Sequence, residues 1–176
     1  MLVPWRRVRY WQCSACGRCC REYRVPLRFY EYLKLKPTGF VEERRGKFYI
    51  RKIGGRCPFQ HGNLCLLQGE LKPTACKLYP FSIRRKGDEL SEFEYGDEVF
   101  YVYVDVSTCP NVVLGKAGEG MRRLVEEAVQ IYVGERRRME LMTANLYYTR
   151  GSKFRYEGAS EQKGHHKTAH LGRTDQ

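Results

Sequence analysis

Cysteine is the residue type in this chain whose number and spacing most clearly indicate chemistry. The eight cysteines are Cys13, Cys16, Cys19, Cys20, Cys57, Cys65, Cys76 and Cys109. Thiols three residues apart in a tight turn point to the same side, so Cys13 and Cys16 could hold one metal ion, and Cys19 would add a third thiolate. Gly17 lies where such a turn often requires a positive φ, which glycine adopts without steric cost. The segment 13–20 is therefore the predicted start of a metal site.

The order of cysteines in this segment begins like the cluster loop of a bacterial ferredoxin, Cys-x2-Cys-x2-Cys. The ferredoxin ending x3-Cys-Pro is missing, and Cys20 follows Cys19 directly. Because adjacent side chains diverge in extended or irregular backbone, we expect Cys20 to point toward a second centre or to bridge two centres. We expect one centre to use the first three cysteines with one cysteine from residues 57–76. The remaining cysteines, with Cys20, would form the second centre.

Disulfide bonds are the alternative use of an even number of cysteines. Residues 1–12 contain three arginines and no apolar segment of the kind that a secretory signal carries. A chain of 176 residues can also bury a core without disulfides. Several cysteines at x2 spacing would compete for the same disulfide partners. We therefore favour metal ligation, and we expect a cytoplasmic protein whose thiols stay reduced.

Composition limits the class of protein and leaves its partners open. Hydrophobic residues make up 42% of the chain and aromatic residues 13%, which is enough for a globular core. No apolar run approaches the roughly 18 residues of a membrane span, so we expect no membrane partner. The formal net charge is +12, and the chain would remain basic after eight thiolates bound two divalent metals. A nucleic acid or an acidic protein is therefore a candidate partner.

Hydrophobic patterning predicts short antiparallel strands and one short helix before residue 110, and helices after it. The predicted elements are an edge strand within 1–12, a helix over 29–36, a hairpin of 40–44 with 47–51, a hairpin of 81–85 with 90–95 turning at Gly87, a strand over 99–106, and an amphipathic helix from 119 that Gly134 would separate from a second helical piece over 135–148. We expect a small metal-centred α+β domain over residues 1–150. The polar residues 151–176 are expected to form a disordered tail.

Several of these segments resemble the CxxCxxCC family of zinc- or iron-chelating domains, also called the YkgJ-like cysteine-cluster family. The resemblance covers roughly residues 10–110 and rests on Cys13-x2-Cys16-Gly17-x-Cys19-Cys20, Cys57-Pro58-Phe59, Cys65-Leu66-Leu67, Lys72-Pro73-x2-Cys76-x2-Tyr79-Pro80-Phe81 and Cys109. It implies that all eight cysteines are candidate ligands of iron or zinc. Members are often called Fe–S oxidoreductases, and a related cysteine domain occurs in flagellin lysine N-methylases, which suggests a link to protein modification.

Two functional hypotheses follow from the cysteines. The first is a protein with one or two Cys-ligated [4Fe–4S] centres that transfers electrons to a redox or protein partner. The looser x7 and x10 spacings around Cys65 favour it over the paired motifs of zinc ribbons. The second is a structural zinc module whose basic surface binds nucleic acid or an acidic protein. We find no acid–base pair, so an enzymatic role, as an Fe–S oxidoreductase or an accessory to protein modification, stays an open alternative. His61 is a weaker ligand candidate, because a histidine in a loop is more often solvated.

Overall fold

The computed structural model describes residues 1–67, 71–142, 146–147 and 155–156. The chain divides into two units, Met1–Ala144 and Asn145–Gln176, which are described separately. In the second unit, β12 (Leu146–Tyr147) pairs with β13 (Arg155–Tyr156) in an antiparallel ladder. The predicted disordered tail over 151–176 lies outside the described residues, apart from β13.

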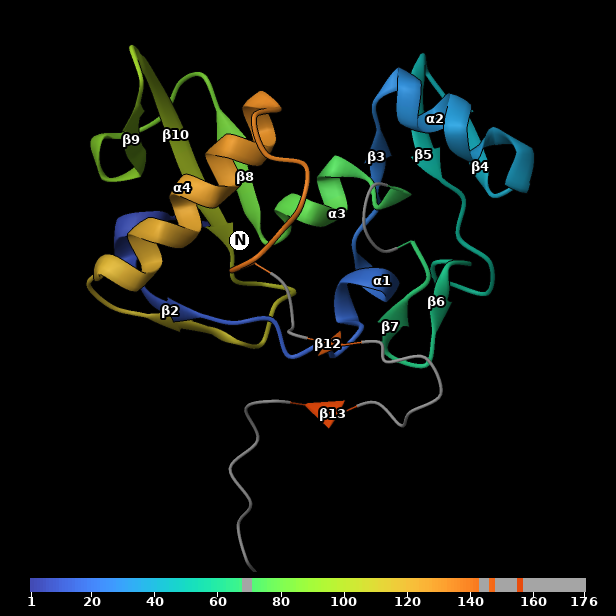
Figure 1. Cartoon of the computed structure of the whole chain (residues 1–176), viewed down its shortest axis with the longest axis horizontal. Helices are drawn as coiled ribbons and strands as arrows, with labels where there is room; N and C mark the ends of the chain where they lie inside the picture. The colour runs from blue at the N-terminus through green and yellow to red at the C-terminus, as the bar shows by residue number, and fades with distance from the viewer. Residues whose placement is uncertain (68–70, 143–145, 148–154, 157–176) are drawn as a thin grey trace, which may run out of the picture. The chain divides into compact units, whose positions relative to one another are not determined.

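The first unit contains a sheet built on β10 (Glu98–Asp105), the strand that was predicted over 99–106. Along β10, Phe100, Val102 and Val104 are buried and alternate with less buried residues, as a sheet with one face in the core requires. Three strands pair with β10 in antiparallel fashion, namely β1 (Leu2–Pro4), β8 (Phe81–Arg84) and β9 (Glu92–Tyr95). Figure 1 shows α4 (Glu119–Val133) packed across this sheet.

The predicted amphipathic helix is confirmed in α4, and the predicted second helical piece is wrong. The buried face of α4 includes Met121, Val125 and Val129, at helical spacing. The helix ends at Gly134, which has a φ of 92° and caps it in the left-handed conformation. The described residues after Gly134 lie in turns and bends up to residue 142, and 146–147 form β12. Gly134 therefore ends the helical conformation.

The predicted hairpin between 81–85 and 90–95 is also wrong, because β8 and β9 do not pair with each other. Both pair with β10. Between β8 and β9 lies the 3-10 helix η4 (Glu89–Ser91), whose Ser91 side chain is buried and donates to the Asp88 carbonyl at 2.6 Å. The tight turn instead joins β9 to β10 at Gly96, which has a φ of 59°.

A second, smaller sheet has the order β3-β5-β4 and confirms the other predicted hairpin. Its strands are β3 (Pro26–Leu27), β4 (Val41–Arg44) and β5 (Lys47–Ile50). The predicted helix over 29–36 is α2 (Phe29–Leu35), which continues into the 3-10 helix η2 (Lys36–Thr38). The ring of Tyr32 on α2 stacks on Phe48 of β5, with 4.3 Å between ring centroids. This sheet and helix form a second hydrophobic core, separate from the β10 core.

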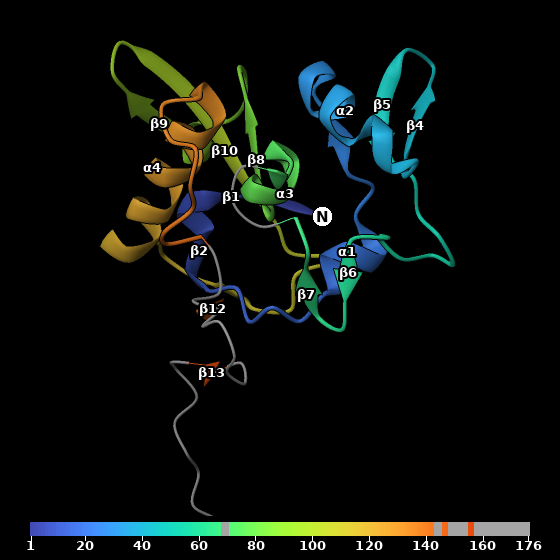
Figure 2. The same ribbon diagram turned by 45° about the vertical axis from the view of Figure 1, so that its right-hand side comes forward.

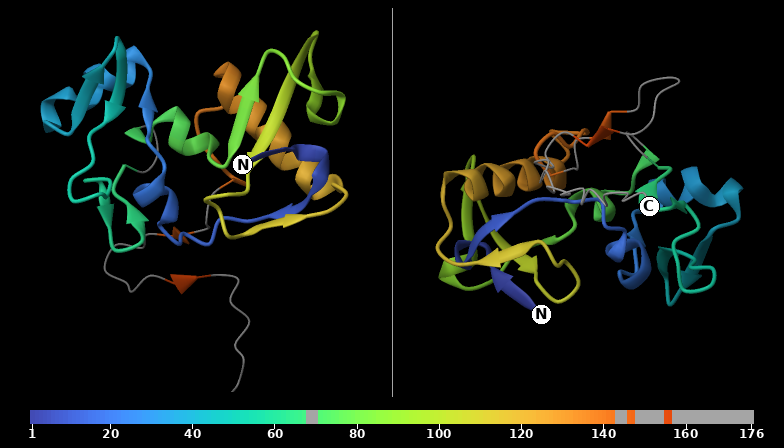
Figure 3. Two further views of the ribbon diagram at one scale, coloured as in Figure 1. Left: turned by 180° about the vertical axis from the view of Figure 1, so that it is seen from behind. Right: turned by 90° about the horizontal axis from the view of Figure 1, so that it is seen from below.

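The predicted strand within residues 1–12 is divided in two by the 3-10 helix η1 (Trp5–Arg7). After η1, β2 (Val8–Trp11) pairs with β11 (Val112–Leu114). Figure 3 shows these two strands side by side in the view from behind. Val8 and Trp11 are both buried, so the expected two-residue alternation is not observed here.

The remaining elements are short and carry cysteines. They are α1 (Arg18–Glu22), β6 (Gln60–His61), β7 (Leu64–Cys65) and α3 (Thr74–Leu78). Figures 1 and 2 both show α3 between α4 and the sheet that contains β5. The predicted α+β class is confirmed, with short antiparallel strands and few helices. Within the described part of the chain, no helix is long and apolar enough to cross a membrane.

Candidate metal centres

The cysteine turn at residues 13–20 depends on Gly17, as predicted. Gly17 has a φ of 71° and stands directly before α1. A Cβ atom built on it would lie 2.4 Å from Nε2 of Gln60 and 3.4 Å from Asn63. Cys19 and Cys20 then lie inside α1, so the expected irregular backbone at these two residues is wrong. Adjacent cysteines in a helical turn are held in fixed relative directions by the backbone.

Cys13 and Cys109 pack against the β10 core, and the charges of Cys13 and Cys16 both act on Cys109. Cys109 follows β10, and the indole N–H of Trp11 donates to its sulfur at 3.2 Å. Burial raises the pKa of the Cys109 thiol, and the charges of Cys16 and Cys13 raise it further, against the lowering effect of the Trp11 hydrogen bond. Such mutual effects require short separations. We call this set the first group.

The second group contains the other five cysteines, which are Cys19, Cys20, Cys57, Cys65 and Cys76. A hydrogen bond with Cys19 raises the pKa of Cys20, as do burial and the charges of Cys57 and Cys65. Burial, followed by the charge of Cys65, raises the pKa of Cys76 on α3. The backbone N–H of Cys57 donates to the Cys20 carbonyl at 3.0 Å, which ties the later segment to α1.

Within the second group, Cys19 is the cysteine whose thiolate form is favoured by a lowered pKa. The hydrogen bond from the Cys20 thiol lowers the pKa of Cys19 to about 6, against the opposing effect of burial. The charge of Lys72 lowers it further. Lys72 also opposes the rise in the pKa of Cys76, and Lys52 does the same for Cys57. These two lysines are parts of the site that sequence reasoning missed, because neither is adjacent to a cysteine.

Four basic residues lie next to cysteines in the sequence, where their charges could offset the thiolates. They are Arg18, Arg21, Arg56 and Lys77. Two of them have other partners. Arg18 pairs with Glu22 one helical turn later, at 3.4 Å. The Lys77 ammonium donates to the carbonyl oxygen of Arg137 at 2.8 Å. Proximity in sequence was therefore a poor guide to which cations act on the thiols, because a helix directs neighbouring side chains to different sides.

Tyr79 lies within electrostatic reach of both cysteine groups. Burial raises its pKa, and the charges of Asp105, Cys109 and Cys19 contribute in the same direction. Its hydroxyl donates to Oδ2 of Asp105 at 3.4 Å, and its ring lies 5.0 Å from the ring of Tyr23. Both tyrosines line a cavity of about 410 Å³. The motif Cys76-x2-Tyr79-Pro80-Phe81 contains Tyr79, but the sequence assigned no role to its side chain.

The two groups also differ in the core against which they pack. Cys13 and Cys109 pack against the β10 core, whereas Cys20, Cys57, Cys65 and Cys76 belong to the smaller core or pack against it. Among the described residues, no three His, Cys, Asp or Glu side chains converge closely enough to hold an ion directly. His61, the weaker candidate, is exposed. The candidate metal ligands in both groups are thus thiols alone. Tertiary contacts bring them near one another.

This donor set fits zinc or iron. Soft thiolates select zinc and iron–sulfur clusters over hard cations such as magnesium and calcium. The thiols of each group raise one another's pKa values, as charges of one sign do when they are brought together. A bound cation would remove that repulsion, since metal coordination deprotonates thiols outright.

Comparison with known proteins identifies the family. The family model described as "Putative zinc- or iron-chelating domain", CxxCxxCC, matches residues 12–109, which include all eight cysteines. The match covers more than half of the chain. This chain belongs to the CxxCxxCC family. Membership supports metal binding and does not distinguish zinc from iron.

One curated relative matches part of the chain. It is the uncharacterized protein MJ0939 of Methanocaldococcus jannaschii, with 34% identity over 95 residues. The match covers 49% of this chain and 34% of the relative, so the chain matches about a third of the relative's length. No solved structure matches the chain.

Proposed function

We propose that this CxxCxxCC protein holds two cysteine-ligated [4Fe–4S] centres and uses them to transfer electrons. The observation that carries the proposal is the division of six of the eight thiols between two cores. One group of eight would be too many for a single tetrahedral ion or a single cluster, each of which takes four. Two sets of four account for every cysteine.

The proposed first centre uses Cys13, Cys16, Cys19 and Cys109. Cys19 is assigned to this set so that each centre has four thiolate ligands, and its charge acts on Tyr79 together with that of Cys109. The remaining four, Cys20, Cys57, Cys65 and Cys76, form the second centre beside the smaller core. This assignment keeps the sequence expectation that Cys19 and Cys20 serve different centres. It replaces the expected fourth ligand from residues 57–76 with Cys109.

Features around the thiols favour iron–sulfur over zinc. When bound, a [4Fe–4S] centre takes up and releases one electron. The Trp11 indole donates to the Cys109 sulfur, and hydrogen bonds to ligating sulfur are one means by which proteins set a cluster's potential. The rings of Tyr23 and Tyr79 lie 5.0 Å apart, and the charges of Cys19 and Cys109 both act on Tyr79, so aromatic side chains contribute to the surroundings of the thiols. A structural zinc site needs no such tuning.

Metal analysis with an absorption spectrum tests this proposal on protein purified without oxygen. We expect a brown protein with a broad band near ~400 nm and about eight irons per chain, matched by acid-labile sulfide. A colourless protein with about one or two zinc ions per chain would contradict it. That outcome would support the structural zinc module, and salt-dependent binding to RNA or DNA would then be measured to test the basic surface.

A further inference from the structure

A cavity of about 280 Å³ lies between α2, α3 and the residues that follow α4, and no cysteine is among the described residues that line it. Five cationic residues line it, namely Arg28, Lys34, Lys77, Arg136 and Arg137. None of the described residues that line it is acidic. Five cations at one concave site repel one another, which is a cost unless an anion offsets it. This set is called the basic pocket below.

Backbone carbonyl groups hold two of these cations in place. The guanidinium of Arg28 donates to the carbonyl oxygen of Tyr132 at 3.1 Å. The ammonium of Lys77, which is only 8% exposed, donates to the carbonyl oxygen of Arg137 at 2.8 Å. Carbonyl groups orient a cation without cancelling its charge. The bond of Arg28 therefore keeps its charge at the pocket.

The two buried carboxylates near the basic pocket are engaged by backbone and hydroxyl donors. Glu31 accepts from the N–H and the hydroxyl of Thr74, each at 2.6 Å, and from the N–H of Arg28 at 2.8 Å. Glu127 accepts three backbone N–H groups from residues 140–142 and pairs with Arg136 at 3.3 Å. Glu140 also pairs with Arg136, at 3.1 Å. The five cations that line the pocket outnumber these three described carboxylates.

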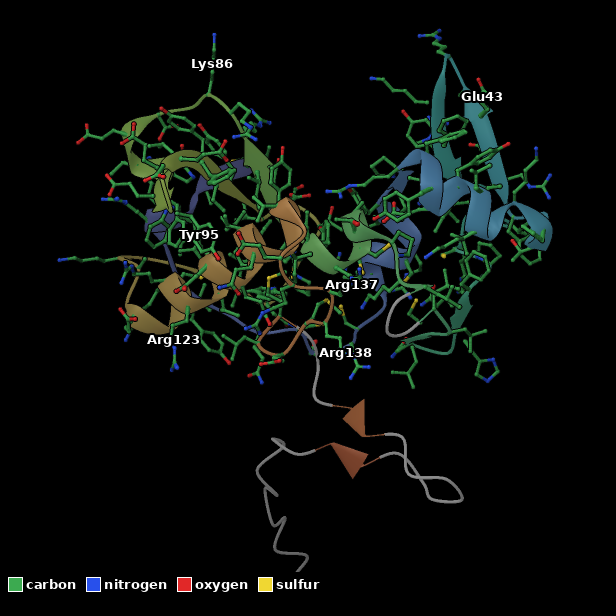
Figure 4. All side chains as sticks on the ribbon, turned by 45° about the horizontal axis from the view of Figure 1, so that its top comes forward. Glu43, Lys86, Tyr95, Arg123, Arg137 and Arg138 are labelled. Atoms are coloured by element: carbon green, nitrogen blue, oxygen red, sulfur yellow. The ribbon has the colours of Figure 1, made fainter. Side chains whose placement is uncertain are left out.

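Three pocket cations have no carboxylate partner within the described part of the chain. The ion pairs there include neither Arg28 nor Lys34 nor Arg137. Arg137 follows the turn at Gly134, whose left-handed conformation redirects the chain after α4. Figure 4 shows Arg137 beside α3, the helix that carries Lys77.

We propose that the basic pocket binds a small ligand bearing a diphosphate or a similar phosphorylated group. Arginine guanidinium groups match phosphate oxygens through paired N–H donors, and lysine adds point charges. A volume of about 280 Å³ equals that of roughly nine liquid water molecules, at about 30 Å³ each, which suits a diphosphate group. The inference goes beyond electron transfer and does not depend on which metal the cysteines hold.

The shape of the pocket favours a small anion over a nucleic acid. A nucleic-acid backbone spreads its charges along an extended path, and proteins meet it with a groove or a stripe of cations. Here the cations line one concave site and come from three segments that are distant in sequence. Small-molecule sites are concave in this way and contain a few convergent polar groups.

Calorimetric titration of the full-length, metal-loaded protein with pyrophosphate tests the proposal at constant ionic strength. We expect saturable binding to one site. Arg137→Gln and Lys34→Gln should each weaken that binding by about tenfold, the effect of losing one charge-assisted contact. Arg137→Gln leaves the carbonyl group that accepts from Lys77, and both side chains are exposed, so the variants should remain folded.

Two control variants remove the same amount of charge elsewhere on the molecule. Lys86 and Arg123 are exposed, and neither lines the pocket; Figure 4 shows Lys86 at the outer tip of the loop after β8. Lys86→Gln and Arg123→Gln should leave the pyrophosphate affinity within about twofold of the original. Absence of saturable binding, equal losses in all four variants, or tighter binding of citrate than of pyrophosphate would overturn the proposal.

Discussion

At Gly17 the backbone and the space around it both exclude a side chain. The φ of 71° costs an L-residue about 1–2 kcal/mol relative to right-handed conformations. The nearest atom to a new Cβ would be Nε2 of Gln60, at 2.4 Å. This amide also donates to the Gly62 carbonyl at 3.0 Å, so it cannot move without a cost. Gly17 therefore determines how the cysteine turn meets the segment that brings Cys57 and Cys65.

Gly17→Ala is expected to lower both stability and metal content. Its backbone cost should be about 1–2 kcal/mol in the free energy of unfolding, and displacement of Gln60 should add to it. Gly39→Ala is the matched control, because Gly39 has a φ of 72° and a Cβ added there would have nothing within 4 Å. Chemical denaturation and metal analysis of both variants measure the difference. Equal stability losses with full metal content in both would contradict this role for Gly17.

At the scale of elements, Glu127 connects α4 to the residues that follow it. Its side chain is 2% exposed and accepts the backbone N–H groups of Glu140, Leu141 and Met142. Arg136 pairs with the same carboxylate and also with Glu140, at 3.1 Å. In this segment the buried carboxylate accepts the backbone N–H groups that a helix or a strand would otherwise pair. This is how the chain after Gly134 is held without a second helix.

Glu127→Gln should destabilise the protein by about 1–3 kcal/mol, because an amide offers one acceptor oxygen in place of two and leaves a buried N–H group without a partner. Glu140→Gln is the control, since Glu140 pairs with the same arginine but is largely exposed. We expect its effect to stay below about 0.5 kcal/mol. Thermal unfolding of both variants gives the comparison, and a similar shift for the two would show that the backbone contacts contribute nothing.

At the scale of the whole molecule, the two proposed centres should contribute separately to the stability of the fold. Cys109→Ser should remove about half of the iron by opening the first centre, and Cys65→Ser should remove the other half. Because metal-binding energy is folding energy in such sites, each change should also lower the melting temperature.

The double variant Cys65→Ser/Cys109→Ser tests whether the two centres are separate. Its losses of iron and of stability should be close to the sum of the single losses, as expected for sites without shared ligands. Iron content and thermal unfolding are measured on all three proteins. Complete loss of iron in either single variant would show that the thiols form one centre and would exclude the proposed 4 + 4 division.

Local sequence patterns were sufficient to predict the elements whose structure is determined by their own residues. The β-branched and aromatic residues of β10, the helical spacing on α4 and the Arg45-Gly46 turn between β4 and β5 each specify their structure within a short window. The predictions failed where the strand pairing depends on a partner that is distant in sequence. β8 and β9 flank an apparent hairpin turn, yet both pair with β10, whose eight residues provide partners for all four residues of each strand.

The same distinction applies to the candidate site. By itself the sequence determined that eight thiols are present, that Gly17 shapes the first turn and that soft metals suit the donors, because residue type and short spacing are local properties. Only the tertiary structure decided which thiols meet. Cys109 reaches Cys13 because β11 pairs with β2, and Cys57 reaches Cys20 through a backbone hydrogen bond to α1. These contacts depend on how the two cores pack, and spacing along the chain does not contain that information.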